Sequence, residues 1–229
     1  MEEFLNKRKS RLVAVSLLII LSVVVVFAGS RLYSQYREQV IRTEESQLLT
    51  MAGIVGNNLN SYMEQQLEEI DLFYSREGMP ENVWAESGGI NARTAYFLKN
   101  NAGVYNWITV TEPDGTKFRY EPGKKTFQES ADGEVKAVDP QDGNHPAEIT
   151  GKEISDQTGW YELYIEKNVP VGSEVYMLTF AIDLGALYAK IVAPVKIGEA
   201  GYSSVKDQNM NIIMHHVKNQ IGLDRKSVV

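Results

Sequence analysis

The 229-residue chain has no cysteine, and its first proline is Pro80. The absence of cysteine excludes a disulfide scaffold, and a hydrophobic content of 43% excludes a wholly disordered chain. Basic residues are also few, because 23 Lys and Arg stand against 30 Asp and Glu, a net charge of -7. Nucleic-acid affinity comes largely from cations that neutralise phosphates, so we expect no nucleic-acid partner.

Charge is missing altogether from residues 12–29, which read LVAVSLLIILSVVVVFAG. A helix of this length rises about 1.5 Å per residue and is just long enough to cross about 30 Å of hydrocarbon. We therefore predict a transmembrane helix at residues 12–30. A cleaved signal peptide is the alternative, since Ala28, Gly29 and Ser30 resemble a cleavage site. The apolar run exceeds the usual about 7 to 15 residues of a signal peptide, which favours the retained anchor.

Residues 1–11 form a basic stub, which predicts a cytoplasmic N-terminus and an extracytoplasmic position for everything after residue 30. The first 31 residues hold five Lys and Arg and two Asp and Glu. Residues 32–229 therefore hold 18 basic and 28 acidic residues, a net charge of -10. The part expected outside the membrane is acidic.

Residues 31–76 are predicted to form one long amphipathic helix. Apolar residues recur there at steps of three and four, at Tyr33, Tyr36, Val40, Leu48, Met51, Val55, Leu59, Tyr62, Met63, Leu67, Ile70 and Tyr74. Gly78 and Pro80 supply the signals that end it. Such a helix is about 60 Å long, too long for one small domain to cover. We expect its lower half to pair with a second copy in a homodimer and its upper half to pack on a folded domain.

After Pro80 the pattern changes to short elements. In chain order we predict a helix at 91–100, a hairpin from strands 104–111 and 116–120, a strand at 159–169, an apolar central strand at 175–184, a short helix before Pro194, and a second hairpin from 201–206 and 211–215. Residues 121–158 are either a long loop or a weak, exposed pair of strands. The fold class is therefore α+β, with an antiparallel sheet and flanking helices.

The segment from Gly201 onward carries a resemblance to a known family. It reads GYSSVKDQNMNIIMHHVKNQIG, with His215 and the pair Ile221-Gly222 in positions typical of the family, although His216 stands where a proline is usual. Together with the anchor, the long helix and a strand ending in Asp183, it resembles the extracytoplasmic double Cache (PAS-like) sensor domains of bacterial receptors. The resemblance implies a distal Cache subdomain at 80–195 and the start of a truncated proximal one at 196–223.

The resemblance implies a sensory function in a bacterial cell membrane. Members of the family bind a small molecule in the distal pocket, and the amino-acid-binding version carries an Arg two residues before a Trp-aromatic pair. Thr158 occupies that position before Trp160-Tyr161, so no carboxylate salt bridge is supported there and the ligand class stays open. A sensor histidine kinase is the favoured parent, followed by a diguanylate cyclase or a chemoreceptor. The alternative is a single-anchor extracytoplasmic binding protein without an output domain.

A set of aromatic residues with one arginine and one aspartate is the candidate ligand site. If the strands pair as expected, several of them line one face of the sheet and form an aromatic pocket for a small anion or zwitterion. The alternative is that they are ordinary core and cross-strand residues. The set consists of Trp107, Arg119, Tyr120, Trp160, Tyr161, Tyr176 and Asp183.

No catalytic, metal or cofactor site is predicted. His215-His216 lacks the third ligand and the cysteines that a zinc site would draw on, and in a strand the two rings would point to opposite faces. The acidic residues Asp139, Asp142 and Glu148 lack the spacing of a calcium loop. No nucleophile elbow, phosphate loop or phosphoacceptor motif occurs, so these residues should have no kinase activity.

The last residues, 224–229, depart from the family-like pattern. Their sequence DRKSVV is what one reading frame of a common sequencing adapter encodes (GAT CGG AAG AGC GTC GTG). We expect this tail to be adapter-derived and the natural protein to continue differently, which the source nucleotides would test.

Overall fold

The structure is a computed structural model that describes residues 2–75, 89–124, 127–129, 145–196 and 201–223, with the backbone alone for 2–15 and 127–129. The predicted tail at 224–229, the helix-ending residues Gly78 and Pro80, and Asp139 and Asp142 lie outside the described residues. The chain divides into two compact units, Met1–Gly53 and Ile54–Val229.

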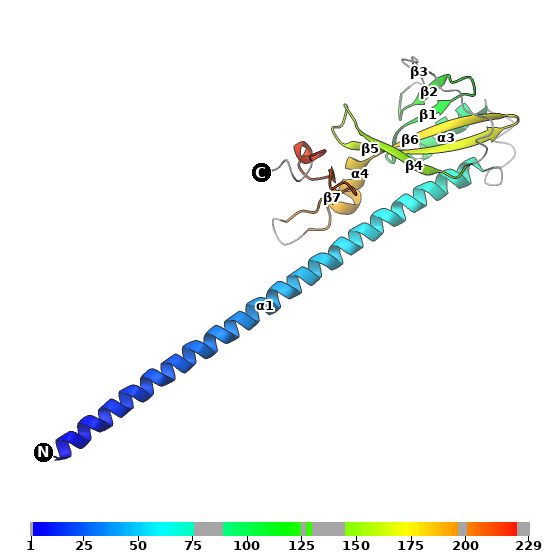
Figure 1. Cartoon of the computed structure of the whole chain (residues 1–229). Coiled ribbons are helices and arrows are strands. Elements are labelled where there is room, and N and C mark those ends of the chain that lie inside the picture. The colour runs from blue at the N-terminus through cyan, green and yellow to red at the C-terminus, as the bar shows by residue number, and fades with distance from the viewer. Residues whose placement is uncertain (1, 76–88, 125–126, 130–144, 197–200, 224–229) are drawn as a thin grey trace. The chain divides into compact units, whose positions relative to one another are not determined.

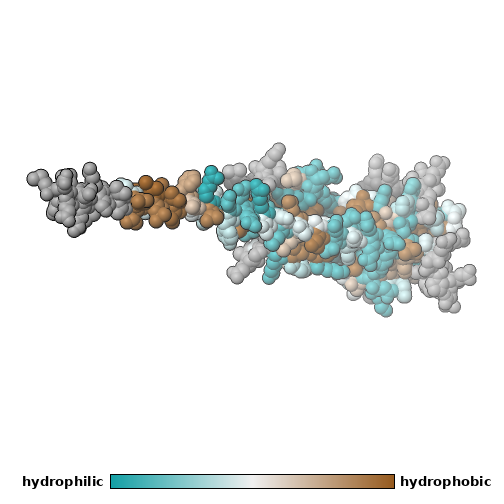
Figure 2. All heavy atoms as spheres, turned by 90° about the horizontal axis from the view of Figure 1, so that it is seen from below, coloured by the Kyte–Doolittle hydropathy of each residue, from teal (hydrophilic) through white to brown (hydrophobic). Residues whose placement is uncertain are grey.

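Helix α1 (Glu2–Tyr74) provides all the described structure of the first unit (Figure 1). Its apolar segment has a mean hydropathy of 2.1 over 18 residues, and Figure 2 shows that segment as a continuous hydrophobic band. The side chains from Leu17 to Phe27 are exposed on all sides of the helix. The helix is therefore long and apolar enough to cross a membrane.

Helix α1 ends at Tyr74, and its last turn is held by a buried arginine. Arg93 of helix α3 (Gly89–Asn100) donates from Nη2 to the carbonyl oxygen of Phe73 at 2.6 Å. Burial lowers the pKa of the Arg93 guanidinium to about 10, which still leaves it charged at neutral pH. A cation at this end suits the negative pole of the helix dipole.

The second unit is built on a six-stranded antiparallel sheet (Figure 1). Its spatial order is β3-β2-β1-β6-β5-β4. The strands are β1 (Tyr105–Thr111), β2 (Lys117–Tyr120), β3 (Phe127–Glu129), β4 (Glu148–Ile154), β5 (Tyr161–Val171) and β6 (Glu174–Asp183). The apolar strand β6 lies inside the sheet, between β1 and β5, so its predicted central position is confirmed.

The two faces of the sheet differ because strand side chains alternate. On one face Ile108, Val110, Ile165, Leu178 and Phe180 pack against the last turns of α1 and against α3, through Ile70, Tyr74, Ile90, Phe97 and Leu98. We call this the helix face. The alternating residues of the same strands point to the opposite side, which we call the outer face.

The segment at 121–158 contains strands that do not pair with each other. Strand β3 pairs with β2, whereas β4 pairs with β5, so the two lie at opposite edges of the sheet. Local composition predicts weak strands but carries no signal for a partner that is far away in the sequence. Of the two expectations for this segment, a long loop or a weak pair of strands, the structure shows two short strands, each paired with another part of the sheet.

A second apolar cluster follows the sheet. Helix α4 (Leu184–Leu187) and the π-helical turn η2 (Tyr188–Val192) pack against α1 at Val55, Leu59 and Tyr62. The predicted second hairpin is present as β7 (Val205–Lys206) and β8 (Ile212–Met214), followed by the short helix η3 (Lys218–Gln220). Met214 joins the same cluster, so the hairpin and α1 share a core.

Candidate ligand-binding face

The centre of the outer face is an aromatic pair above a small residue. Trp107 of β1 and Tyr164 of β5 are both cross-strand neighbours of Ala181 on β6, which is fully buried. The two rings approach to 5.5 Å between centroids at an angle of 50°. Alanine leaves room for two large rings to meet over the central strand.

Arg119 of β2 lies over the Trp107 ring of this pair. Its guanidinium carbon is 4.2 Å from the centroid of the Trp107 ring, a stacked cation-π contact. Its Nε lies 3.3 Å from Oε1 of Glu121. Of the seven predicted site residues, Arg119 and Trp107 are therefore in contact with each other on the outer face.

A buried carboxylate completes the centre of the face. Glu162 of β5 is 6% exposed and accepts hydrogen bonds from Asn106 Nδ2 at 2.8 Å and from Trp107 Nε1 at 3.1 Å. A register shift between Tyr105 and Trp107 marks a bulge at Asn106. Asp183 is the direct cross-strand neighbour of Glu162, and its Oδ1 accepts the backbone N–H of Gly185 at 2.7 Å as the N-cap of α4.

Tyr164 extends the network toward the edge strand. Its hydroxyl donates to Oε2 of Glu153 on β4 at 3.2 Å. Burial, followed by the charge of Glu153, raises the pKa of Tyr164 to about 12, so the phenol is a neutral donor at physiological pH. The outer face thus holds one guanidinium, two aromatic rings and several carboxylates.

Two of the predicted site residues belong to the helix face. Tyr120 donates its hydroxyl to Asn91 Oδ1 of α3 at 2.7 Å and packs in the main core. Tyr176 packs against the same core and donates to Oε2 of Glu174 at 3.1 Å. The structure does not bring these two tyrosines together with Trp107 and Arg119.

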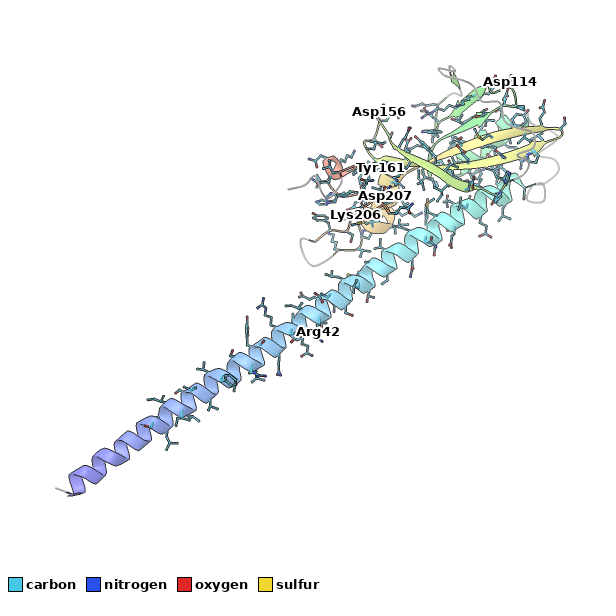
Figure 3. All side chains as sticks on the ribbon, viewed as in Figure 1. Arg42, Asp114, Asp156, Tyr161, Lys206 and Asp207 are labelled. Atoms are coloured by element: carbon cyan, nitrogen blue, oxygen red, sulfur yellow. The ribbon has the colours of Figure 1, made fainter. Side chains whose placement is uncertain are left out.

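Trp160 and Tyr161 lie at the start of β5 and pack in the second cluster. The Trp160 ring contacts Tyr188 at 5.4 Å and covers Gly185 so closely that an added Cβ would meet the ring at 2.6 Å. Tyr161 lies 6.0 Å from Lys152 Nζ, on the side of the β7–β8 hairpin (Figure 3). Thr158 accepts the backbone N–H of Trp160 with its hydroxyl at 3.2 Å, so this side chain serves the turn.

Glu162, Tyr164 and Asn106 were not among the predicted site residues. The strand sequence YELYIEKNV alternates Leu163 and Ile165 with Glu162 and Tyr164, and that period of two could have placed both on the outer face. Asn106 could not be found in this way, because the bulge changes the alternation locally. Among the described residues, no group of three or more His, Asp or Glu is arranged to hold a metal ion.

The fold is similar to those of several solved sensory and ligand-binding domains. It is similar to a domain assigned to the sensory box/GGDEF family from Vibrio parahaemolyticus, with a TM-score of 0.54 and 14% identity over 79% of this chain and 74% of the other. It is also similar to an extracellular domain assigned to the histidine kinase vpHK1S-Z8, with a TM-score of 0.55 and 15% identity over 80% and 73% of the two chains.

A third similar structure is the ligand-binding domain of the Pseudomonas aeruginosa PAO1 amino acid chemoreceptor PctB in complex with L-Gln, with a TM-score of 0.50 and 16% identity over 76% and 69% of the two chains. No protein-family profile and no curated protein matches the sequence. At these identities the likeness concerns the fold. The second unit shares the PAS-like fold of these sensory domains, which is the fold that the resemblance implies.

Proposed function

We propose that this chain is the ligand-binding input region of a membrane-bound bacterial signal-transduction receptor. One observation carries the proposal: the PAS-like sheet packs on the last turns of the same helix whose N-terminal part is apolar enough to span a membrane. A ligand that shifts the end of α1 would change a helix that continues into the anchor. The orientation follows the basic stub, with the sheet outside.

The outer face is the proposed ligand site. Trp107 and Tyr164 supply apolar walls, Arg119 supplies a cation, and Glu162 and Asp183 supply carboxylates from neighbouring strands. This combination suits a small anion or zwitterion with an apolar part. Trp160 then has a supporting role, because it holds the start of α4 next to the Asp183 cap.

For the parent protein we propose a two-component sensor histidine kinase, with a diguanylate cyclase or a chemoreceptor as the next choices. The segment 197–224 favours the kinase by its resemblance. In this account residues 80–195 are the distal subdomain, 196–223 begin the proximal one, and 31–76 form the signalling helix of a homodimer.

A single-anchor extracytoplasmic binding protein without an output domain is the second candidate, since it would share the apolar helix and the sheet. The downstream gene sequence separates the two. A second apolar span of about twenty residues followed by a cytoplasmic domain supports the receptor. A stop codon at this point in the intact genome would support the binding protein.

The ligand site is tested by a thermal-shift screen of small metabolites on the full chain in detergent. We expect at least one anion or zwitterion to raise the melting temperature, and Trp107→Ala and Arg119→Ala each to remove that shift. Lys117→Gln is the matched control, since Lys117 is an exposed cation on the same strand as Arg119. If every binder still raised the melting temperature of both alanine variants, the outer face would be excluded as the ligand site.

A further inference from the structure

A cavity of about 390 Å³ lies on the other side of the sheet, between the end of α3 and the turn that follows β2. Ala95, Leu98, Ala102 and Pro122 give it an apolar lining. Tyr120 contributes its ring, since its hydroxyl is already bonded to Asn91. The volume is within the range of about 300 to 1,000 Å³ typical of small-molecule sites.

Two lysines, Lys99 and Lys124, line this cavity. Lys99 lies in the last turn of α3 and forms no salt bridge with another described residue. Lys124 lies in the turn after β2 and pairs with Glu121. An apolar lining with two cations matches a molecule that has an apolar body and one anionic end.

From this geometry we propose that the cavity is a second small-molecule site, which takes a monocarboxylate with a short apolar chain. The chain lies against Leu98 and the Tyr120 ring, and the carboxylate pairs with Lys99 and Lys124. The site is distinct from the outer face, because Tyr120 and Arg119 are adjacent strand residues and point to opposite sides of the sheet.

Glu121 connects the two sites. Its Oε2 pairs with Lys124 at the cavity, and its Oε1 lies 3.3 Å from Arg119 Nε, the guanidinium stacked on Trp107. A carboxylate bound at Lys124 competes with Glu121 for that lysine. Occupancy of the cavity therefore changes the surroundings of Arg119 and the fluorescence of Trp107.

The test is equilibrium dialysis of radiolabelled hexanoate against the full chain in detergent, with empty micelles as the blank. We expect saturable binding that weakens with added salt, because the lysine at the rim is largely exposed. Lys99→Gln and Lys124→Gln should each weaken it about threefold or more, and Ala95→Phe should abolish it by filling the cavity. Lys117→Gln should leave it unchanged, and Trp107→Ala should still show saturable binding.

Several outcomes would overturn the site: no saturable binding, unlabelled 1-hexanol displacing the label as well as hexanoate does, or unchanged binding in all three cavity variants. Loss of binding in Trp107→Ala would assign hexanoate to the outer face instead. The link through Glu121 predicts a hexanoate-induced fluorescence change that disappears in Trp107→Phe and in Glu121→Gln. Binding with no such change would leave the site standing and refute the link.

Discussion

At the scale of single residues, the packing of Trp160 on Gly185 fixes how the sheet meets α4. The ring covers a position where a Cβ would lie 2.6 Å from Trp160 Cγ, much closer than atoms in contact allow. Glycine is therefore required there by close approach, and its N–H is also the donor that Asp183 caps. The cap and the ring hold the end of β6 in one arrangement.

Gly185→Ala should destabilise the protein by about 1 to 3 kcal/mol, because the extra methyl must displace a packed indole ring. Chemical denaturation of the full chain, followed by tryptophan fluorescence, measures the effect. Gly56→Ala is the matched control: no atom lies within 4 Å of its added Cβ, and alanine in a helix gains about 1 kcal/mol over glycine. Equal stability of the two variants would show that the Trp160 ring does not require glycine at position 185.

An ion pair between a buried lysine and a partly exposed aspartate attaches α1 to the sheet. Lys167 of β5 is 5% exposed, and its Nζ lies 2.8 Å from Asp71 Oδ1 and 2.6 Å from the carbonyl oxygen of His145. Asp71 Oδ1 also accepts the backbone N–H of Ala147 at 2.8 Å. The lysine is thus a charged residue on the helix face, where alternation alone would predict an apolar one.

Asp71→Asn should lower the free energy of unfolding by about 1 to 3 kcal/mol, because the Lys167 charge stays buried while its partner carboxylate is lost. The double variant Asp71→Leu with Lys167→Met should cost less than the single one, because no buried charge remains. Glu38→Gln, at the exposed Arg42–Glu38 pair, should change stability by about 0.5 kcal/mol or less. A double variant that is clearly less stable than Asp71→Asn would contradict this reading of the pair.

At the scale of elements, the hairpin β7–β8 is held to the sheet by contacts at its turn and at its end. Asp207 pairs with Lys152 of β4 at 3.0 Å, and hydrogen bonding from Lys152, aided by Asn211, lowers the pKa of Asp207 to about 2. After the hairpin, Lys218 of η3 donates to the carbonyl oxygen of Thr158, in the turn before β5, at 3.0 Å. Figure 3 shows Asp207 and Lys206 beside this part of the sheet.

The two histidines after β8 have left the strand, so their rings do not point to opposite faces. They lie 4.5 Å apart, and both contact Tyr202, at 4.8 and 3.9 Å. His215 Nδ1 accepts the backbone N–H of Val217 at 3.0 Å, which requires this nitrogen to be unprotonated. Burial, together with the nearby His216, lowers the pKa of His215 from its usual value, against the opposing effect of the Val217 carbonyl oxygen, which lies 3.2 Å from Nδ1.

Because the folded state then binds fewer protons at His215 than the unfolded state, its stability should fall as the pH drops through about 6.5 toward the lowered pKa. His215→Gln should remove this part of the pH dependence. Denaturation midpoints between pH 7.5 and 5.5 measure it, with His145→Gln as the control. If the denaturation midpoint changed equally with pH in wild type and in His215→Gln, the folded state would not protect the His215 ring from protonation.

Most elements of the fold could be predicted from local sequence patterns. Turn residues at Pro113-Asp114-Gly115 and the apolar run of β6 identify strands that the structure contains. The opposite-edge positions of β3 and β4, the bulge at Asn106 and the placement of Lys167 depend on distant partners that one sequence does not reveal. For the same reason the aromatic residues of the predicted site could be named but not assigned to faces.

At the scale of the whole molecule, the proposed function is that of a dimeric receptor with its sheet outside the membrane. The absence of cysteine makes the chain suited to single-cysteine labelling. Gln47→Cys should react with a membrane-impermeant maleimide in intact cells, since it lies after the proposed span. Labelling only after lysis would reverse the orientation.

The proposed homodimer places Tyr33, Tyr36 and Val40 in the contact between two copies of α1. Val40→Cys should therefore form a disulfide dimer in membranes on mild oxidation. Arg42→Cys should crosslink much less, because two residues along a helix turn the side chain by about 200°; Figure 3 labels this position. Similar crosslinking at both positions would mean that the copies meet by random collision.

The central claim, that the outer face binds the ligand, is tested most directly by the dissociation constant of one ligand found in the screen. Isothermal titration on wild type, Trp107→Ala, Arg119→Ala and the helix-face control Tyr176→Phe provides the comparison. The account predicts a loss of affinity of about tenfold or more in the first two variants and an unchanged affinity in the control. Wild-type affinity in both Trp107→Ala and Arg119→Ala would contradict it.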